Sequence, residues 1–420
     1  MAESFDAVVV GGGPGGGTAA CLLAGAGWRV AVLERACFPR RKVCGEYLSA
    51  TNLPLLRRLG MAEAFLQRAG PPVRRAGLFA GETALTAPMP RATGFPDGWG
   101  RALGREVLDT LLLEQAVRTG AQIHQPWSAT KLERHGDEFR CEATAKGSGQ
   151  RRELRTRVVI AAHGSWERGE LPTQPGRRDL RGSDLLAFKA HFRDAVLVEG
   201  LMPLLVFPGG YGGMVHTDAG RVTLSCCLRR DALELARRAR PDVPAAEAVL
   251  AWIRRACRGA REALARARLD GAWLSAGPIR PGTRAAFAKG IFCVGNAAGE
   301  AHPIIAEGIS MALQSAGLLC ERLIAGAGAG ASKRVLVEIG TDYSRAWRRA
   351  FSGRIRAAGL FAQVGMRPSA AGLLLPFIRF SPGLLTFGAR WSGKAREVVG
   401  SAGDGCPGNA RADQVGAGAG

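Results

Sequence analysis

The sequence predicts an α/β fold in which a Rossmann-like domain carries an inserted mixed β-sheet and is followed by C-terminal helices. Near the N-terminus, a glycine-rich turn separates two short apolar runs, residues 7–10 and 30–33, with a helical stretch at 18–26 between them. A second strand, glycine-containing loop and long helix follow near residue 290, after a β-rich region that begins near residue 184. A sheet built from both ends of the chain would leave the middle to form a separate layer.

The glycine-rich turn has the spacing of a dinucleotide-binding loop, Gly11-x-Gly13-x-x-Gly16. Gly11 permits a sharp turn out of the strand, Gly13 leaves room for a pyrophosphate against the backbone, and Gly16 lets the helix pack closely on the strand. The helix N-terminus then directs free N–H groups at the phosphates. Glu34 ends the second strand, where an acidic side chain accepts a hydrogen bond from a ribose hydroxyl. A purely structural glycine turn is the alternative.

The remaining patterns set the expected organisation of the chain. Helical periodicity covers residues 53–70 and 104–120, and an Arg- and Ala-rich helical region covers 231–268. We divide the chain into a dinucleotide-binding domain in three parts, 1–70, 101–182 and 281–330, substrate-layer strands at 71–100, a β-rich substrate domain at 183–280, a C-terminal helical region at 331–399 and a disordered tail at 400–420.

The chain is strongly basic, with a formal net charge of +21 that comes almost entirely from arginine. The arginines are spread along the chain in pairs and accompany no nucleic-acid reading motif, so we expect no nucleic-acid partner. An arginine-rich surface without a specific partner explains this pattern. Attraction to an anionic membrane or to acidic partners is the alternative.

Cysteine usage and the N-terminus indicate the compartment. The ten cysteines include no Cys-x-x-Cys pair and no His/Cys spacing typical of a metal site, which predicts reduced thiols and no metal. Residues 1–6 lack the basic start of a signal peptide. No uncharged apolar run reaches the length of about 18 residues that a membrane-spanning helix needs. We therefore expect a cytoplasmic protein, with peripheral membrane contact left open.

In the order of its motifs, the chain resembles the FAD-dependent oxidoreductases of the geranylgeranyl reductase and aromatic hydroxylase (class A flavin monooxygenase) superfamily over roughly residues 5–330. The matching segments are the glycine turn with Glu34, the element Arg105-x-x-x-Asp109, and "VGNAAGEAHPIIAEGISMAL" at 294–313. The resemblance implies FAD bound in a glutathione-reductase-type domain. The residues it implies for FAD binding are Gly11, Gly13, Pro14, Gly16, Glu34, Arg35, Arg105, Gly295, Asn296, Gly308 and Ile309.

Three positions depart from the pattern of that family. Asn296 and His163 each stand where the family usually has aspartate, and Ala306 takes a usual glycine position. An amide can still donate to or accept from a ribitol hydroxyl, so we expect FAD as the cofactor. The resemblance also implies NAD(P)H as the reductant. A fold that has lost FAD, or a non-catalytic flavoprotein, is the minor alternative.

The segment "RRKVCGEYLSA" resembles that of the geranylgeranyl reductase branch, in which a Lys-x-Cys-Gly element lies beside the flavin. By this resemblance Cys44 is a candidate proton donor to a reduced alkene, and a small packed side chain is the alternative. Flanking Arg41 and Lys42 would lower the pKa of the thiol if they lie close to it. Glu46 is a candidate acid or base by the same proximity.

The segment "FPGGYGGMVHT" resembles a Tyr-x-Trp-x-Phe-Pro strand that lines a lipid cavity in that branch. Tyr211 is retained, but Gly213 and Val215 replace aromatic positions, which leaves a wider aromatic or polyketide substrate open. We predict that Tyr211 and His216 contact the substrate, with a satisfied histidine at a strand end as the alternative for His216. His302, in the flavin-facing loop, is a third candidate catalytic residue.

These features predict an FAD-dependent oxidoreductase that reduces or dehydrogenates a C=C bond of a hydrophobic small molecule with NAD(P)H. Monooxygenases that hydroxylate aromatic or polyketide compounds share the fold and the FAD segments, and they are the alternative. Flavin halogenases carry a Trp-x-Trp-x-Ile-Pro stretch, which this sequence lacks.

The C-terminal segment "GLLLPFIRFSPGLLTFGARW", residues 372–391, is apolar with Arg379 and Arg390 interspersed. We expect a buried, proline-broken helical hairpin here. A cap over the substrate cavity and a segment lying on a membrane surface are the alternatives.

Overall fold

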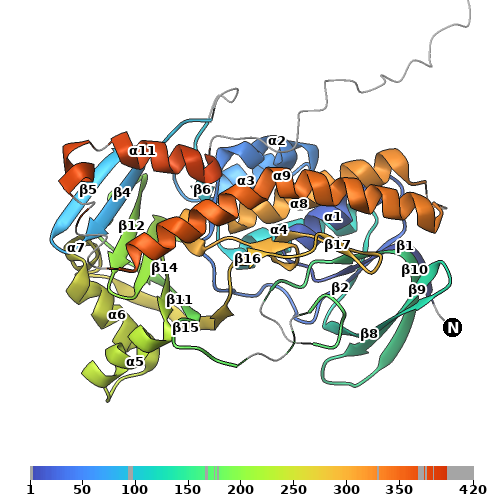
Figure 1. The fold of residues 1–420 in the computed structure, drawn as a ribbon, viewed down its shortest axis with the longest axis horizontal. Coiled ribbons are helices and arrows are strands. Elements are labelled where there is room, and N and C mark those ends of the chain that lie inside the picture. Colours follow the sequence, from blue (N-terminus) through green and yellow to red (C-terminus); the bar gives the residue numbers. More distant parts are fainter. Residues whose placement is uncertain are drawn as a thin grey trace, which may run out of the picture.

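The computed structural model describes residues 3–394, apart from 93–97, 166–168, 175, 177–178, 329–330, 368–372, 374–375 and 382. The predicted tail at 400–420 lies outside the described residues. Figure 1 shows two β-sheets toward opposite ends of the view, with a layer of helices between and above them.

The first sheet combines strands from both ends of the chain, as predicted. Its strand order is β17-β18-β10-β1-β2-β7, with β1 parallel to both β10 and β2, and β18 parallel to β10. A hairpin of two further strands extends antiparallel from β10. The strands are β1 (Glu3–Val10), β2 (Val30–Leu33), β7 (Gln122–His124), β8 (Trp127–His135), β9 (Glu138–Ala145), β10 (Arg151–Ala161), β17 (Phe287–Ala288) and β18 (Ile291–Cys293).

The helices that build the main core with this sheet are α1 (Pro14–Gly25), α4 (Arg105–Arg118), α8 (Gly308–Gly326) and α9 (Lys333–Gly365). Helix α1 begins at Pro14, earlier than predicted, because its first turn is made of glycines that pack closely on neighbouring helices. A Cβ at Gly17 would lie 2.9 Å from the Cβ of Leu112 on α4. The long helix α9 crosses the molecule in Figure 1, and its Tyr343 hydroxyl donates to the carbonyl of Cys293 at 2.8 Å.

The second sheet is formed mainly by the middle of the chain. Its strand order is β15-β11-β14-β13-β12-β4-β5, in which the β12–β4 pair is parallel and the other neighbours are antiparallel. The strands are β4 (Arg75–Ala80), β5 (Thr83–Pro88), β11 (Leu185–Arg193), β12 (Leu201–Phe207), β13 (Gly210–His216), β14 (Val222–Arg229) and β15 (Arg268–Ile279).

One face of the second sheet packs on helices α5 (Arg230–Ala239), α6 (Ala245–Ala256) and α7 (Arg258–Ala263). The region predicted as helical is three helices: Pro241 and Pro244 separate α5 from α6, and an extended residue, Cys257, separates α6 from α7. Along β11, Phe188 and Phe192 belong to this core. Since side chains alternate along a strand, Lys189 and His191 lie on the opposite face, toward the first domain.

Shorter elements connect the two sheets. Two-residue strands pair as β3 with β6 and as β16 with β19. These elements are β3 (Tyr47–Leu48), α2 (Leu53–Arg58), α3 (Ala62–Arg68), β6 (Arg101–Ala102), β16 (Gly282–Thr283), η3 (Gly295–Ala297), β19 (Gly299–Glu300) and η4 (Pro303–Ile305).

The expectation that the C-terminal segment is buried is wrong. A helical stretch over 376–380 and helix α11 (Gly383–Ala389) lie at the surface, with α11 beside β4 and β5, and a π-helical turn η5 (Arg390–Lys394) then packs against α9. Phe380 is 94% exposed, because the sheet edge covers only one side of this segment. Within the described residues, no helix is long and apolar enough to cross a membrane.

Candidate functional site

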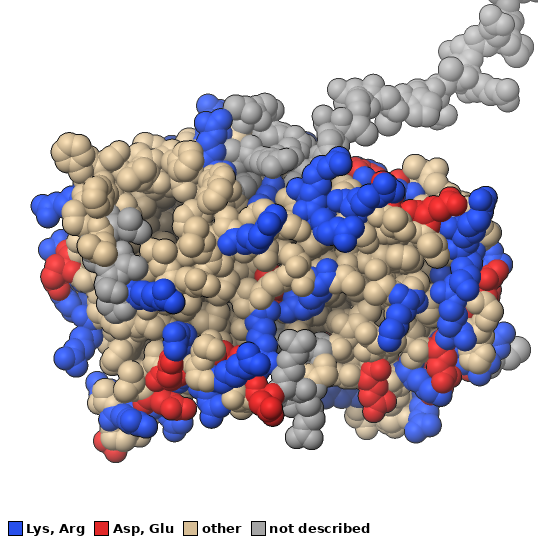
Figure 2. Space-filling view, in the orientation of Figure 1, with Lys and Arg blue, Asp and Glu red and all other residues tan. Residues whose placement is uncertain are grey.

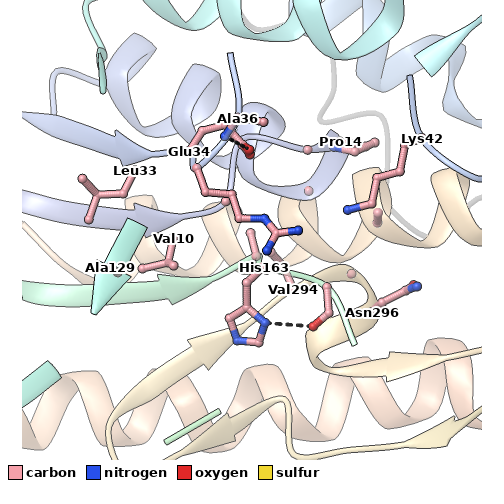
Figure 3. A pocket seen from close by; sticks show the side chains of 18 of the residues that line it. Val10, Pro14, Leu33, Glu34, Ala36, Lys42, Ala129, His163, Val294 and Asn296 are labelled. Carbon is pink, nitrogen blue, oxygen red and sulfur yellow. Dashed lines mark hydrogen bonds between the residues drawn. The ribbon is translucent and has the colours of Figure 1, made fainter. Parts of the chain in front are cut away.

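A cavity of about 640 Å³ runs past the carboxyl ends of β1, β2 and β10. Leu33 and Ala129 lie on one side of it, and Lys42 and Asn296 on the other (Figure 3). The predicted FAD-binding residues that line this cavity are Gly11, Gly13, Pro14, Glu34, Arg35, Arg105, Gly295, Asn296, Gly308 and Ile309. Segments far apart in the sequence thus enclose a single space.

The three glycines of the turn have different surroundings. Gly11 has a φ of +107°, and a Cβ there would lie 2.6 Å from the carbonyl oxygen of Ala162. A Cβ at Gly16 would lie only 1.8 Å from the carbonyl oxygen of Gly11, so Gly16 lets helix and strand touch behind the cavity. At Gly13 the nearest atom to a Cβ would be Nη2 of Arg105, at 3.6 Å. The turn therefore leaves open space at Gly13, on the cavity side.

Glu34 is held in one orientation at the wall of the cavity. Its carboxylate accepts hydrogen bonds from the backbone N–H groups of Gly12 at 2.8 Å and Ala36 at 2.9 Å, the latter drawn in Figure 3. Arg40 forms an ion pair with the same carboxylate at 3.5 Å. This arrangement places an acceptor where the sequence predicts a ribose hydroxyl.

Arg105 supplies a fixed positive charge on the same cavity. Its Nε and Nη2 donate to the two carboxylate oxygens of Asp109, each at 2.7 Å. Burial opposes the charge of Arg105, but the adjacent Asp109 carboxylate outweighs burial and raises the pKa of the guanidinium. A guanidinium held in this way is suited to a phosphate group.

The positions that depart from the family pattern keep polar contacts. The Asn296 side-chain N–H donates to Glu300 at 2.9 Å, which leaves the amide oxygen as an acceptor. The two ring nitrogens of His163 bond the carbonyl of Gly164 at 2.9 Å and the hydroxyl of Thr173 at 2.8 Å. Burial lowers the pKa of His163 to about 4, so the ring is neutral at pH 7.

These residues fit FAD. The open space at Gly13 accommodates a pyrophosphate next to Arg105, and Glu34 and Asn296 offer acceptors for the ribose and the ribitol hydroxyls. Ala306 adopts a left-handed conformation with φ +53°, which glycine adopts most easily and which explains why glycine is usual there.

Glu46 lies outside this cavity, in a buried ionic cluster between the 41–46 loop and the second sheet. Its carboxylate accepts hydrogen bonds from Nε2 of His191 at 2.8 Å, the backbone N–H of Arg105 at 3.1 Å, the ammonium of Lys189 and the hydroxyl of Thr223. Burial alone would raise the pKa of Glu46, but the hydrogen bond from His191 and the charge of Lys189 hold it well below its usual range. Glu46 is therefore ionised at neutral pH.

The sequence reasoning missed Lys189 and His191. A signal was present, because they occupy alternate positions in the otherwise apolar stretch "LLAFKAHF". Two polar residues on one face of a buried strand indicate a partner across that face.

Cys44 lines the cavity together with Lys42. The backbone N–H of Glu46 donates to its sulfur at 3.3 Å, so the anchored Glu46 also fixes the position of the Cys44 thiol. The structure thus places Cys44 at the cofactor cavity and Glu46 behind it.

Tyr211 and His302 lie together, with the Tyr211 hydroxyl 3.2 Å from Nδ1 of His302, and neither lines the cavity. Tyr211 belongs to an apolar cluster at the junction of the two domains. Burial lowers the pKa of His302 to about 4. Nε2 of His216 lies 2.9 Å from the carbonyl oxygen of Leu197, away from the other predicted residues. The catalytic and substrate roles of these residues stay predictions.

This fold with this cavity defines an FAD-dependent oxidoreductase. The chain matches the FAD-binding domain family over residues 4–342 and belongs to that family.

Among curated proteins, the chain is similar to the menaquinone reductase of Mycobacterium tuberculosis (strain ATCC 25618 / H37Rv), with 33% identity over 180 residues, 42% of this chain and 41% of that protein. It is also similar to the rifampicin monooxygenase of Streptomyces venezuelae, with 28% identity over 212 residues, 48% of this chain and 43% of that protein. The alignments thus span less than half of either relative.

Solved structures with the same fold include the myxobacterial chondrochloren halogenase, with a TM-score of 0.74, 21% identity and coverage of 93% of this chain and 91% of that chain. A geranylgeranyl bacteriochlorophyll reductase-like protein from Thermoplasma acidophilum has a TM-score of 0.69 and 17% identity, covering 89% of this chain and 90% of that chain. At these identities the likeness concerns the fold alone.

Proposed function

We propose that this enzyme reduces a C=C bond of a hydrophobic small molecule, with NAD(P)H as the reductant. The observation that carries the proposal is the position of Cys44, which lines the same cavity as Gly308 and Ile309, two of the predicted flavin-binding residues. Sequence similarity to a menaquinone reductase and to the geranylgeranyl diphosphate reductase of Rhodobacter capsulatus supports reduction of a hydrophobic substrate.

FAD, when bound by residues such as Gly13, Arg105 and Gly308, would supply hydride-transfer chemistry. In this proposal Cys44 donates the accompanying proton from its sulfur and regains a proton from solvent. Glu46 does not transfer a proton, because its carboxylate is ionised and fully engaged by His191, Lys189 and Thr223. It holds the 41–46 loop against the second sheet and so positions Cys44.

We also propose that the substrate binds at the junction between the two domains. Tyr211 and His302 belong to the substrate side, where an apolar cluster that includes Leu185 and Ile279 meets the loop before α8. We place the enzyme in the cytoplasm, in peripheral contact with a membrane, where hydrophobic substrates concentrate.

Product analysis under anaerobic conditions tests the proposal. The purified holoenzyme is incubated with NADPH and geranylgeranyl diphosphate, and the products are analysed by mass spectrometry. The proposal predicts a product that has gained two hydrogens without oxygen. A substrate that changes only when oxygen is present, with a mass gain of one oxygen atom, would contradict it.

Monooxygenation is the second candidate. It is supported by similarity to the rifampicin monooxygenase and by Gly213 and Val215, which stand where the reductase branch has an aromatic wall. A wider substrate layer suits an aromatic or polyketide compound. Oxygen consumption that requires such a substrate would favour this function over reduction.

A further inference from the structure

The C-terminal segment carries a stripe of exposed apolar side chains. In each of its helical pieces, 376–380 and 383–389, two of the exposed side chains are three residues apart, which is the spacing of one helix face. The members of the stripe are Leu373, Phe377, Phe380, Leu384, Phe387 and Trp391, whose exposed fractions are 73%, 67%, 94%, 47%, 64% and 56%. Among the large apolar side chains exposed in the described part of the chain, every Phe and Trp belongs to this stripe. We call these six residues the C-terminal stripe.

The opposite side of the same segment is anchored to the protein. The Thr386 hydroxyl donates to the carbonyl of Pro88 at the end of β5 at 2.7 Å, and Ala389 packs in an apolar cluster with Tyr47. The ammonium of Lys394 bonds the carbonyl of Ile305 and forms an ion pair with Glu307 at 3.2 Å. The outward direction of the stripe is therefore fixed by contacts on its inner side.

Charge favours one kind of partner for this surface. Residues 366–394 contain no Asp or Glu, and Arg367, Arg379 and Arg390 are exposed on the same segment. Figure 2 shows the face over α11, β4 and β5, at the upper left, as mostly free of charged residues, with Lys and Arg around it. A second copy of this chain would bring a further net charge of +21 against these arginines. An anionic lipid surface would neutralise them while accepting the aromatic side chains.

We propose that the C-terminal stripe docks the enzyme on an anionic lipid bilayer, with the aromatic side chains at the level of the headgroups and the three arginines on the lipid phosphates. The segment spans no membrane; it lies on the surface. Because Lys394 is bonded at Ile305 and Glu307, directly before the cavity-lining Gly308, the docked face borders the flavin-side loop. The inference rests on the membrane contact of the proposed function and assigns it to a surface, but it does not depend on which reaction the enzyme performs.

Co-sedimentation of the full-length holoenzyme with vesicles tests the proposal. Vesicles of phosphatidylcholine with phosphatidylglycerol are compared with vesicles of phosphatidylcholine alone. The wild-type chain is expected to sediment with the anionic vesicles at least tenfold more than with the neutral ones. The triple variant Phe377→Ser/Phe380→Ser/Phe387→Ser keeps the charge of the chain and is expected to lose at least nine-tenths of this binding.

A matched control removes exposed apolar side chains elsewhere. Val196 and Val198 are 62% and 56% exposed, and the Val196→Ser/Val198→Ser variant is expected to bind as the wild type does. Retained flavin absorbance and melting temperature show that each variant is folded. Equal binding of the triple variant and the wild type would overturn the proposal, as would a wild-type chain that stays in the supernatant. A dimer in size-exclusion chromatography that the triple variant abolishes, without vesicle binding, would instead assign the stripe to a second copy.

Discussion

Glu46 and His191, 145 residues apart in the sequence, share a buried hydrogen bond of 2.8 Å that ties the 41–46 loop to the second sheet. The ammonium of Lys189, on the same strand as His191, also bonds Glu46. Lys189 and His191 both point away from the apolar core on the other face of their sheet. Because Cys44 precedes Glu46 by two residues and lines the cofactor cavity, this ionic cluster links the wall of the cavity to the second sheet.

Replacing Glu46 should destabilise the protein strongly. Glu46→Gln leaves the Lys189 ammonium buried without its counter-charge, which costs about 3–5 kcal/mol when one partner of a buried pair is removed. Urea unfolding measures the change in the free energy of unfolding. The exposed pair of Arg258 and Glu262 provides the control, and Glu262→Gln should change stability by less than about 1 kcal/mol.

A double variant tests whether Glu46 and Lys189 stabilise the protein through one shared interaction. Glu46→Gln combined with Lys189→Met should be less destabilised than the sum of the two single variants, because the residues share one interaction. Additive losses would show that Glu46 and Lys189 do not act as a unit.

Alanine substitutions at Gly13 and Gly16 should have different effects on stability and on FAD binding. Gly13→Ala fills only open space on the cavity side, so the apo protein should keep its melting temperature and bind FAD at least tenfold more weakly. Gly16→Ala brings a Cβ to 1.8 Å from a carbonyl oxygen and should lower the melting temperature itself. Gly25→Ala, at the far end of α1 with its nearest atom at 3.9 Å, is the control. Unchanged FAD affinity in Gly13→Ala would refute the assigned pyrophosphate position.

Two buried histidines, His163 and His302, should make the stability of the folded protein depend on pH. Burial lowers the pKa of His302 and of His163 from 6.5 to about 4 in the folded chain. Below pH 6.5 the unfolded chain takes up protons that the folded chain does not, so stability falls as the pH drops from 6.5 towards 4. Each histidine contributes up to about 1.4 kcal/mol per pH unit in this window.

Urea unfolding at several pH values measures this slope. His302→Gln should reduce the slope between pH 6.5 and 4, and adding His163→Gln should reduce it further. His135, on the exposed hairpin of the first sheet, is replaced in parallel to control for the general effect of losing a histidine. A slope that is the same in all variants would assign the acid sensitivity to other groups.

Cys44→Ser should separate the two halves of the reaction. A serine keeps the size of the side chain but is a much weaker proton donor, so substrate reduction should slow by about 100-fold or more. Flavin reduction by NADPH should be unchanged, since it does not need this proton. Stopped-flow absorbance follows both steps, and Cys37→Ser, an exposed cysteine of the same region, should behave as the wild type. Equal loss in both steps would indicate that Cys44 acts only on FAD binding.

The sequence predicted the parts of the fold that local patterns determine. The glycine spacing and Glu34 located the turn, and the strands predicted at 7–10 and near residue 290 are joined in one sheet in the structure. The three-helix division of 231–268 was not predicted, although Pro241 and Pro244 marked the first of its two interruptions.

Contacts between distant segments could not be predicted in this way. The binding of Glu46 by Lys189 and His191 depends on how β11 is placed against the 41–46 loop, which no local pattern specifies. The burial of the C-terminal segment was predicted wrongly for the same reason. Hydrophobicity alone does not reveal that β4 and β5 cover one side of α11 and leave Phe380 and Phe387 in solvent.

The visible spectrum of the holoenzyme under anaerobic NADPH distinguishes a C=C reductase from a monooxygenase. We expect a yellow protein that bleaches without substrate and regains its colour when geranylgeranyl diphosphate is added in the absence of oxygen. A flavin that stays oxidised with NADPH until an aromatic compound is bound, and that is reoxidised only by oxygen, would contradict a reductase and identify a monooxygenase.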